Sequence, residues 1–366
     1  MNIPLVDLKA NYNSIKPEID AAIQTIIDNS SFIMGKPVKQ FEENFAKASS
    51  MKHCIGVANG TVAVELALRV LGVGKNDEVI IPANTFIATS ESVTAVGARC
   101  VFVDVEEDSM NIDSEKVEQA ITPKTKAIIA VHLYGRMANM EKLQEIAKRH
   151  DLLLIEDAAQ AHLAEFKGKK PGQQSGIATF SFFPAKNLGA FGDAGGIVCN
   201  DDEIAKKLGM MRNHGRLSKY EHEFEAFNYR MDALQAAILD VKLEYLEKWN
   251  ESRRKIAKRY DEMLKGVVGT PPVNADYKQV YYMYEIRTDK RDDLLEFLKE
   301  EGVSCGIHYP LPLHLQPAYK YLGYNKGDFP VAEKCADEIL SIPIYPELSE
   351  EQQDYVVKCI KEFFND

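Results

Sequence analysis

Two apolar runs in this sequence each lead to a side chain that can do chemistry. Residues 152–155 precede Asp157, and residues 178–183 precede Lys186, which opens a segment rich in glycine. A carboxylate buried at a strand end can keep a pyridine nitrogen protonated, and a lysine amine can bind an aldehyde carbon covalently. The glycines between residues 189 and 196 leave room for a bound group. These features predict a pyridoxal phosphate site.

Each of these residues alone has an ordinary explanation. A lysine after a strand is usually a solvated surface residue, and an aspartate there usually caps a helix. Gln160 follows Asp157 by three residues, and Ser181 lies where the second apolar run ends. Asp157, Gln160, Ser181 and Lys186 all suit the chemistry of one cofactor. This agreement favours a cofactor site over four unrelated ordinary roles.

The whole chain resembles the DegT/DnrJ/EryC1/StrS family of sugar aminotransferases, with motifs in order from residues 3–8 to residues 341–346. The resemblance implies a fold type I transferase that uses pyridoxal 5′-phosphate to aminate keto-sugars carried on a nucleoside diphosphate. It makes Lys186 the catalytic residue that binds the cofactor and moves the proton. It makes Asp157 the partner of the ring nitrogen.

Further cofactor contacts follow from the same resemblance. Gly60 and Thr61 open a predicted helix, whose free amides and dipole can bind the phosphate. Ser181 matches a hydroxyl donor to that phosphate, Phe86 a ring stacked on the cofactor, and Gln160 a neighbour of the cofactor hydroxyl.

Asn228 matches a residue that reaches the cofactor phosphate of a neighbouring subunit. The resemblance therefore implies a homodimer with shared active sites. Lys219, in a segment with several basic residues, is our first choice for the substrate diphosphate.

The acceptor sugar is predicted from the loop 186–193. This loop resembles that of family members that aminate carbon 3 of a dTDP-linked 3-keto-6-deoxyhexose, with L-glutamate as the donor. His308, Tyr309 and His314 lie in a segment that the resemblance places at the sugar. Two alternatives stay open: a 4-aminotransferase acting on a UDP- or dTDP-linked 4-keto-6-deoxyhexose, and a noncatalytic relative that binds the cofactor.

Other chemistries are disfavoured by residues that the sequence lacks. It has no arginine after Arg291, which argues against an enzyme dedicated to amino-acid and keto-acid pairs. The two histidines at 308 and 314 have no third ligand of suitable spacing, so we predict no metal site. The family's dehydratases carry histidine at the position of Lys186. No Gly-x-Gly-x-x-Gly follows an early strand, which disfavours a nucleotide-dependent oxidoreductase.

Composition predicts a cytoplasmic enzyme. The 366 residues carry a formal net charge of −11, which disfavours binding to nucleic acid. No apolar segment approaches the ~18 residues of a membrane span, and the first residues do not resemble a secretory signal. The six cysteines are scattered and contain no Cys-x-x-Cys pair, as expected for free thiols in a reducing compartment.

Alternating apolar runs and helical patterns predict an α/β fold with a mainly parallel sheet. We expect a large cofactor-binding domain over 1–245 and a smaller α+β domain over 246–366. The predicted strands of the large domain are 54–58, 78–81, 100–105, 127–132, 152–156, 178–182 and 196–199. Those of the small domain are 281–287, 304–309 and 340–344. Leu163 stands where relatives usually have glycine.

Overall fold

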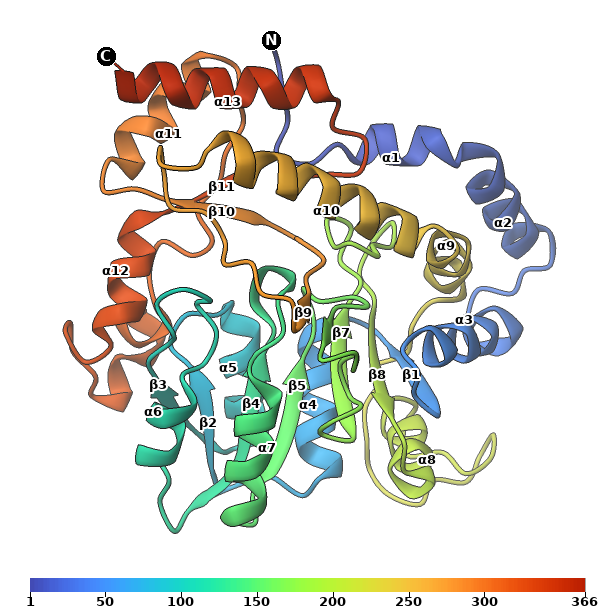
Figure 1. Ribbon diagram of the computed structural model, residues 1–366. Coiled ribbons are helices and arrows are strands. Elements are labelled where there is room, and N and C mark those ends of the chain that lie inside the picture. The colour runs from blue at the N-terminus through green and yellow to red at the C-terminus, as the bar shows by residue number, and fades with distance from the viewer. Residues whose placement is uncertain (366) are drawn as a thin grey trace.

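A seven-stranded sheet forms the centre of the computed structural model, which describes residues 1–365 (Figure 1). Across the sheet the strands are β1 (His53–Val57), β8 (Gly195–Cys199), β7 (Ile177–Ser181), β5 (Leu153–Asp157), β4 (Thr125–Val131), β2 (Glu78–Pro82) and β3 (Arg99–Val103). Only β8 runs antiparallel to its neighbours β1 and β7, and the other neighbouring pairs are parallel. The prediction of an α/β fold with a mainly parallel sheet is therefore confirmed.

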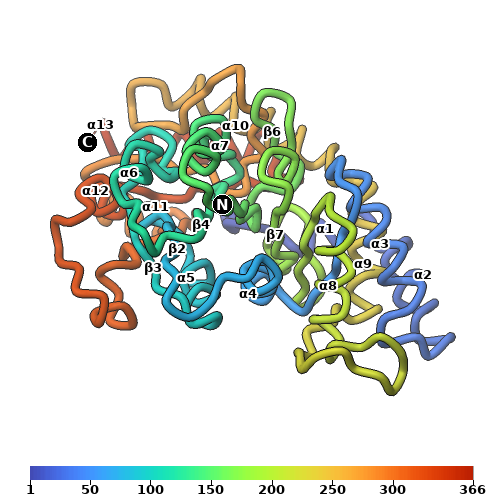
Figure 2. The backbone as a smooth tube through the Cα atoms, turned by 90° about the horizontal axis from the view of Figure 1, so that it is seen from below, coloured from blue at the N-terminus to red at the C-terminus, as the bar shows by residue number. Residues whose placement is uncertain are grey.

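Both faces of the sheet are covered, which explains the near-continuous apolar runs. In β2, Val79 and Ile81 belong to one core cluster and Ile80 to another, because successive side chains point to opposite faces. Figure 2 shows α6 and α7 on one face, and α4, α5 and α8 on the other. These helices are α4 (Gly60–Val70), α5 (Ile87–Ala95), α6 (Ser114–Gln119), α7 (Met140–Arg149) and α8 (Asp202–Met211).

Helices from the two ends of the chain flank this sheet. The N-terminal helices are α1 (Leu8–Ser14), α2 (Lys16–Asp28) and α3 (Gly35–Ala48), and α3 packs against α9 (Ala233–Leu243). The long helix α10 (Leu246–Met263) follows. Leu246 belongs to a core cluster of the sheet, whereas Ile256 and Tyr260 belong to a separate cluster with C-terminal residues. We therefore retain a division of the chain near residue 245 as a proposal.

The C-terminal part is built on a two-stranded antiparallel sheet of β10 (Tyr284–Arg287) and β11 (Ile339–Ile342). Its helices are α11 (Arg291–Glu300), α12 (Pro330–Glu338) and α13 (Glu350–Asn365), with short 3-10 helices η2 (Leu313–Leu315) and η3 (Pro317–Leu322). The remaining short elements are η1 (Leu133–Gly135), β6 (Glu165–Phe166) and β9 (Tyr277–Lys278). No helix within residues 1–365 has the length and apolar character to cross a membrane.

One predicted strand was wrong. Residues 304–309 form no strand, and Gly306 makes only an isolated bridge to Ser341. The chain bends after this bridge, so that the side chains of His308 and Tyr309 reach the active-site region instead of continuing a ladder.

Candidate active site

Asp157 is the last residue of β5, and only 7% of its surface is exposed. Thr89 donates its hydroxyl to Oδ2 at 2.8 Å, and the amide of Ala159 donates to Oδ1 at 3.1 Å. The two donors fix the orientation of the carboxylate. A buried, oriented carboxylate of this kind fits the ring nitrogen of pyridoxal phosphate.

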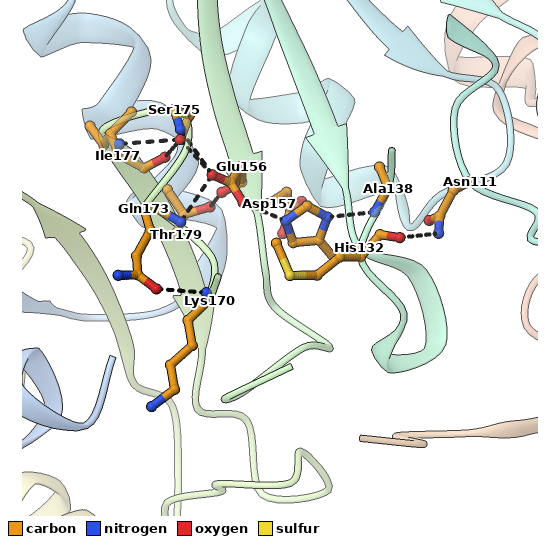
Figure 3. Close-up of polar contacts among 12 residues, drawn as sticks. Asn111, His132, Ala138, Glu156, Asp157, Lys170, Gln173, Ser175, Ile177 and Thr179 are labelled. Atoms are coloured by element: carbon orange, nitrogen blue, oxygen red, sulfur yellow. Dashed lines mark hydrogen bonds and ion pairs between the residues drawn. The ribbon is translucent and has the colours of Figure 1, made fainter. Parts of the chain in front are cut away.

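A buried network holds the strand end behind Asp157 (Figure 3). The amide of Ala138 donates to Nδ1 of His132 at 3.1 Å, so the proton of this neutral ring is on Nε2, which faces Glu156 at 2.7 Å. Glu156 also accepts the hydroxyl of Ser175 at 2.7 Å. Because the amide of His132 bonds the carbonyl of Asp157 at 2.9 Å, the network fixes the position of Asp157.

Lys186 lies in the loop between β7 and β8, with its Nζ 4.2 Å from the centre of the Tyr282 ring. Burial lowers the pKa of Lys186 to about 8, and the negative charge of Asp157 opposes this effect. The two residues are therefore close enough to interact. A depressed pKa gives the amine a sizeable neutral fraction near physiological pH, as a nucleophile and base require.

Contacts from α10 and α9 hold the lysine loop in place. Asn187, the residue after Lys186, donates its amide to Asn250 at 2.9 Å and to the carbonyl of Val280 at 2.9 Å. Lys242 donates to the carbonyl of Gly189 at 2.5 Å. A Cβ on Gly189 would lie 2.2 Å from the carbonyl oxygen of Pro184, so the loop closes only with glycine there.

The N-terminus of α4 meets Ser181 closely. Asn59 caps this helix by accepting the amide of Val62 at 3.0 Å. Within residues 1–365, no hydrogen bond is recorded for the amides of Gly60 and Thr61, so both can serve an anion. A Cβ on Gly60 would lie 2.6 Å from Cβ of Ser181. This cradle of amides and a hydroxyl fits the cofactor phosphate.

Phe86, Gln160 and Tyr309 are brought to one side of this region. The Phe86 ring is 53% exposed, and its centre lies 5.6 Å from that of Tyr309. Gln160 donates to the hydroxyl of Tyr309 at 3.2 Å and accepts the amide of Tyr134 at 2.7 Å. An exposed aromatic ring beside fixed polar groups fits a flat cofactor ring.

The other predicted substrate residues are dispersed. His308 lies near Lys186, whose charge, together with burial, lowers the pKa of the His308 imidazole. The side chain of His314 is instead fully buried and contacts Glu333 at 2.9 Å, so the structure does not bring it to the site. Among the described residues 1–365, no cluster of histidine, cysteine or acidic side chains could hold a metal ion.

Asn228 and Lys219 are both exposed. Lys219 lies in the hairpin that runs out beside α8, away from the C-terminal segments that carry Tyr282 and Tyr309 (Figures 1 and 2). The structure therefore does not bring Lys219 to Lys186 of the same chain.

Comparison with known proteins identifies this arrangement. The model of the DegT/DnrJ/EryC1/StrS aminotransferase family matches residues 13–361. The chain belongs to this family. It is an aminotransferase, and its cofactor is pyridoxal 5′-phosphate.

Three relatives illustrate the range of similarity within the family. A "pleiotropic regulatory protein" of Geobacillus stearothermophilus is 50% identical over 100% of this chain and 99% of its own length. The dTDP-3-amino-3,4,6-trideoxy-alpha-D-glucose transaminase of Streptomyces venezuelae is 42% identical over 99% of this chain and 96% of its own. The crystal structure of S. venezuelae DesV with a ketimine intermediate superposes with a TM-score of 0.98, at 42% identity, covering 100% of this chain and 99% of that one.

Sequence reasoning missed several residues that support the site. Thr89 and Tyr282 contact the predicted residues Asp157 and Lys186, and Asn250 accepts the amide of Asn187, the neighbour of Lys186. The three come from separate helices and from the segment before β10. Thr89 follows the predicted Phe86 by one helical turn, which is the only signal that could have indicated it.

The contact between Gly60 and Ser181 leads to a testable expectation. Gly60→Ala should push the start of α4 away from Ser181 and weaken pyridoxal phosphate binding at least about tenfold, or about 1.4 kcal/mol. Titration of the apoprotein with the cofactor, followed by absorbance, measures this. Gly209→Ala in α8 is the matched control, because a Cβ there meets nothing within 4 Å. Equal cofactor affinity in the two variants would contradict the assigned phosphate site.

Proposed function

We propose that this enzyme transfers the amino group of L-glutamate to carbon 3 of a dTDP-linked 3-keto-6-deoxyhexose, in deoxyamino-sugar biosynthesis. The observation that supports this choice most strongly is the 42% identity with the S. venezuelae transaminase along nearly the whole of both chains. The loop 186–193, which follows the catalytic lysine, resembles that of the carbon-3 enzymes.

The chain's own residues supply the steps of this transfer. Bound pyridoxal phosphate provides the electron sink for the carbon that loses its proton. The Asp157 carboxylate, which Thr89 and the Ala159 amide hold in one orientation, would pair with the ring nitrogen. Nζ of Lys186 would take the proton from the α-carbon of the amino donor and carry it for the return transfer. In the second half-reaction, Nζ of Lys186 would carry the proton in the opposite direction while the keto-sugar is aminated.

A panel of acceptors tests the substrate. Purified enzyme with L-glutamate and dTDP- or UDP-linked 3-keto and 4-keto sugars should aminate the dTDP-linked 3-keto-6-deoxyhexose most efficiently. Mass spectrometry and NMR identify the products. Turnover of 4-keto sugars alone would refute the carbon-3 assignment and favour the 4-aminotransferase alternative.

We also propose that the enzyme is a homodimer with shared sites. Asn228 and Lys219 are exposed, so both side chains are accessible to a neighbouring subunit. The cytoplasmic location, proposed from the unpaired cysteines, stays a prediction.

Mixed dimers test this arrangement. Lys186→Ala and Asn228→Asp should each be inactive or nearly so, the second because a carboxylate repels the phosphate. After subunit exchange, activity should reappear, because a hybrid dimer contains one site with both native residues. If confirmed hybrids stay inactive, each site is built from a single chain.

Lys219→Ala tests the diphosphate contact. We expect the KM for the sugar nucleotide to rise about tenfold or more, since a charge-assisted contact contributes roughly 1.5–3 kcal/mol. The glutamate half-reaction, followed by stopped-flow absorbance, should be nearly unchanged. Equal damage to both half-reactions would show that Lys219 has another role.

The second candidate function is regulation without catalysis. The name of the 50% identical G. stearothermophilus relative favours it. The presence of Lys186 and the fixed Asp157 carboxylate favours catalysis, because a protein that only binds the cofactor needs no proton carrier. A turnover measurement separates the two.

A further inference from the structure

A second buried polar chain lies in the C-terminal part of the molecule, next to the active site. Glu285 on β10 and Ser341 on β11 are directly opposite each other in the antiparallel ladder. Both are buried, at 2% and 0% exposed. The hydroxyl of Ser341 contacts Oε1 of Glu285 at 2.5 Å. The cross-strand pair therefore forms one connected polar unit in an apolar core.

The same unit extends to His308. Gly306 bridges Ser341 on its other side, which places His308 two residues further on the same face. Nδ1 of His308 lies 2.6 Å from the hydroxyl of Ser341. A Cβ on Gly306 would lie 2.8 Å from Cε1 of His308, so the missing side chain makes room for the ring.

His308 ends this series of hydrogen bonds on the side of Lys186. Nε2 of His308 has no hydrogen-bond partner within residues 1–365. Unlike Oε2 of Glu285, this nitrogen is not fully buried. Burial and then the positive charge of Lys186 lower the pKa of the His308 imidazole, so the ring lies within the range of that charge. Tyr134 donates to the His308 carbonyl and thereby holds the residue in place.

We propose that His308, Ser341 and Glu285 form a relay that moves one proton between Lys186 and the buried carboxyl of Glu285. With Glu285 ionised, Nδ1–H of His308 donates to Oγ of Ser341, and Oγ–H donates to Oε1 of Glu285. When Nε2 takes a proton from the Lys186 ammonium, Nδ1 passes its proton to Oγ, and Oγ passes its own to Oε1. The ring stays neutral, the carboxylate becomes a carboxylic acid, and the lysine becomes a neutral amine.

The energetics suit such an exchange. Burial raises the pKa of Glu285 to about 8 and lowers that of Lys186 to about 8, so neither group holds the proton much more strongly. Burial and the Lys186 charge lower the pKa of His308, which disfavours a charged imidazolium. Oε2 of Glu285 is buried without a partner, and this adds to the cost of the ionised form.

The other ionisable groups around Glu285 do not store the proton in its place. The groups with a charge interaction with Glu285 are Tyr134, Tyr282, Tyr309 and Cys305, and burial raises the pKa of each, so all stay neutral. Arg136 lines the same small cavity as Glu285, but its charge is not among the causes of the shifted pKa. In this relay Glu285 and Ser341 act on Lys186 only through His308, and so they are positioning residues. The relay therefore rests on the proposed role of Lys186 as the proton carrier.

Nitrogen NMR of holoenzyme with isotope-labelled histidine tests the relay without any sugar substrate. The His308 signal can be assigned by its loss in His308→Gln among the eight histidines of the chain. From about pH 10 down to about pH 6, we expect the proton of the neutral ring to move from Nδ1 to Nε2, with a midpoint near pH 8. Glu285→Gln keeps the shape but cannot store a proton, so this change should disappear.

Asp261→Asn is the matched control. Asp261 is another carboxyl whose pKa is raised by burial, and it accepts the hydroxyl of Tyr284, the neighbour of Glu285. The His308 titration should be unchanged in this variant. The glutamate half-reaction of Glu285→Gln should slow at least about tenfold.

Two results would overturn the relay. One is a wild-type His308 ring with the same protonated nitrogen across this pH range, and the other is an identical titration in wild type and Glu285→Gln. If Glu285→Gln does not fold, the wild-type titration and the carbon NMR signal of the Glu285 carboxyl still decide. Failure of the sugar assignment would leave these spectra unaffected.

Discussion

Replacing Lys186 by alanine should lower kcat for amino transfer by about 10⁴-fold or more. Burial lowers the pKa of the amine at this position to about 8, and the charge of Asp157 opposes this shift. Alanine would remove both the proposed point of cofactor attachment and the proposed proton carrier. Steady-state kinetics with L-glutamate and the keto-sugar measure the loss.

Chemical rescue separates a missing proton carrier from a damaged fold. Small primary amines added to Lys186→Ala should restore part of the activity, because they can occupy the vacated space and carry the proton. Lys206→Ala, at an exposed lysine of α8, serves as the control and should retain full activity. In wild type, borohydride should attach the cofactor to residue 186. Attachment to another lysine would contradict the assignment.

Asp157→Asn should reduce kcat by about 10³-fold, or about 4 kcal/mol of transition-state stabilisation. The amide has nearly the same shape, and its oxygen can still accept the Ala159 amide, so the fold and much cofactor binding should survive. It carries no negative charge, and so it cannot hold the ring nitrogen protonated. Cofactor content by absorbance and kcat are measured on the same preparation.

An exposed carboxylate provides the comparison for this variant. Asp337 lies on α12 and is exposed, so Asp337→Asn should keep wild-type kcat. Near-normal turnover of Asp157→Asn, with full cofactor content, would mean that the ring nitrogen lies elsewhere.

Much of the sheet and the centre of the site could be predicted from the sequence. Buried parallel strands have long apolar runs, and their carboxyl ends meet at one edge, where Asp157 and Ser181 lie. Gly60 opens α4 as predicted, whereas Gly189 makes room for the carbonyl of Pro184 and not, as the sequence had suggested, for a bound group. The strand ends and the start of α4 depend on residues that lie close together in the sequence, so they can be predicted from it.

Contacts between distant elements could not be predicted. Thr89 and Asp157 are 68 residues apart, and Glu285 and Ser341 are 56 apart, so only the packing of helices and strands brings them together. His314 illustrates the converse, since a polar residue in a segment expected at the sugar is turned into the core by Glu333 and Phe329.

Leu163 replaces the glycine that relatives usually have at this position, and the structure shows how the backbone accommodates it. Its φ is 62°, in the left-handed region that glycine adopts without strain. Glycine at this position in relatives is consistent with that backbone conformation. In this chain the buried leucine side chain packs in the core beside the sheet, and this packing offsets the strain.

Absorption spectroscopy of the holoenzyme can show whether this chain catalyses amino transfer through Lys186. Purified holoenzyme should be yellow, lose this absorption when L-glutamate is added, and regain it when the dTDP-linked 3-keto-6-deoxyhexose follows. One equivalent of amino-sugar should form per active site in this cycle. A protein that binds pyridoxal phosphate but keeps its absorption unchanged with glutamate and other amino donors would contradict the account and favour a regulatory relative.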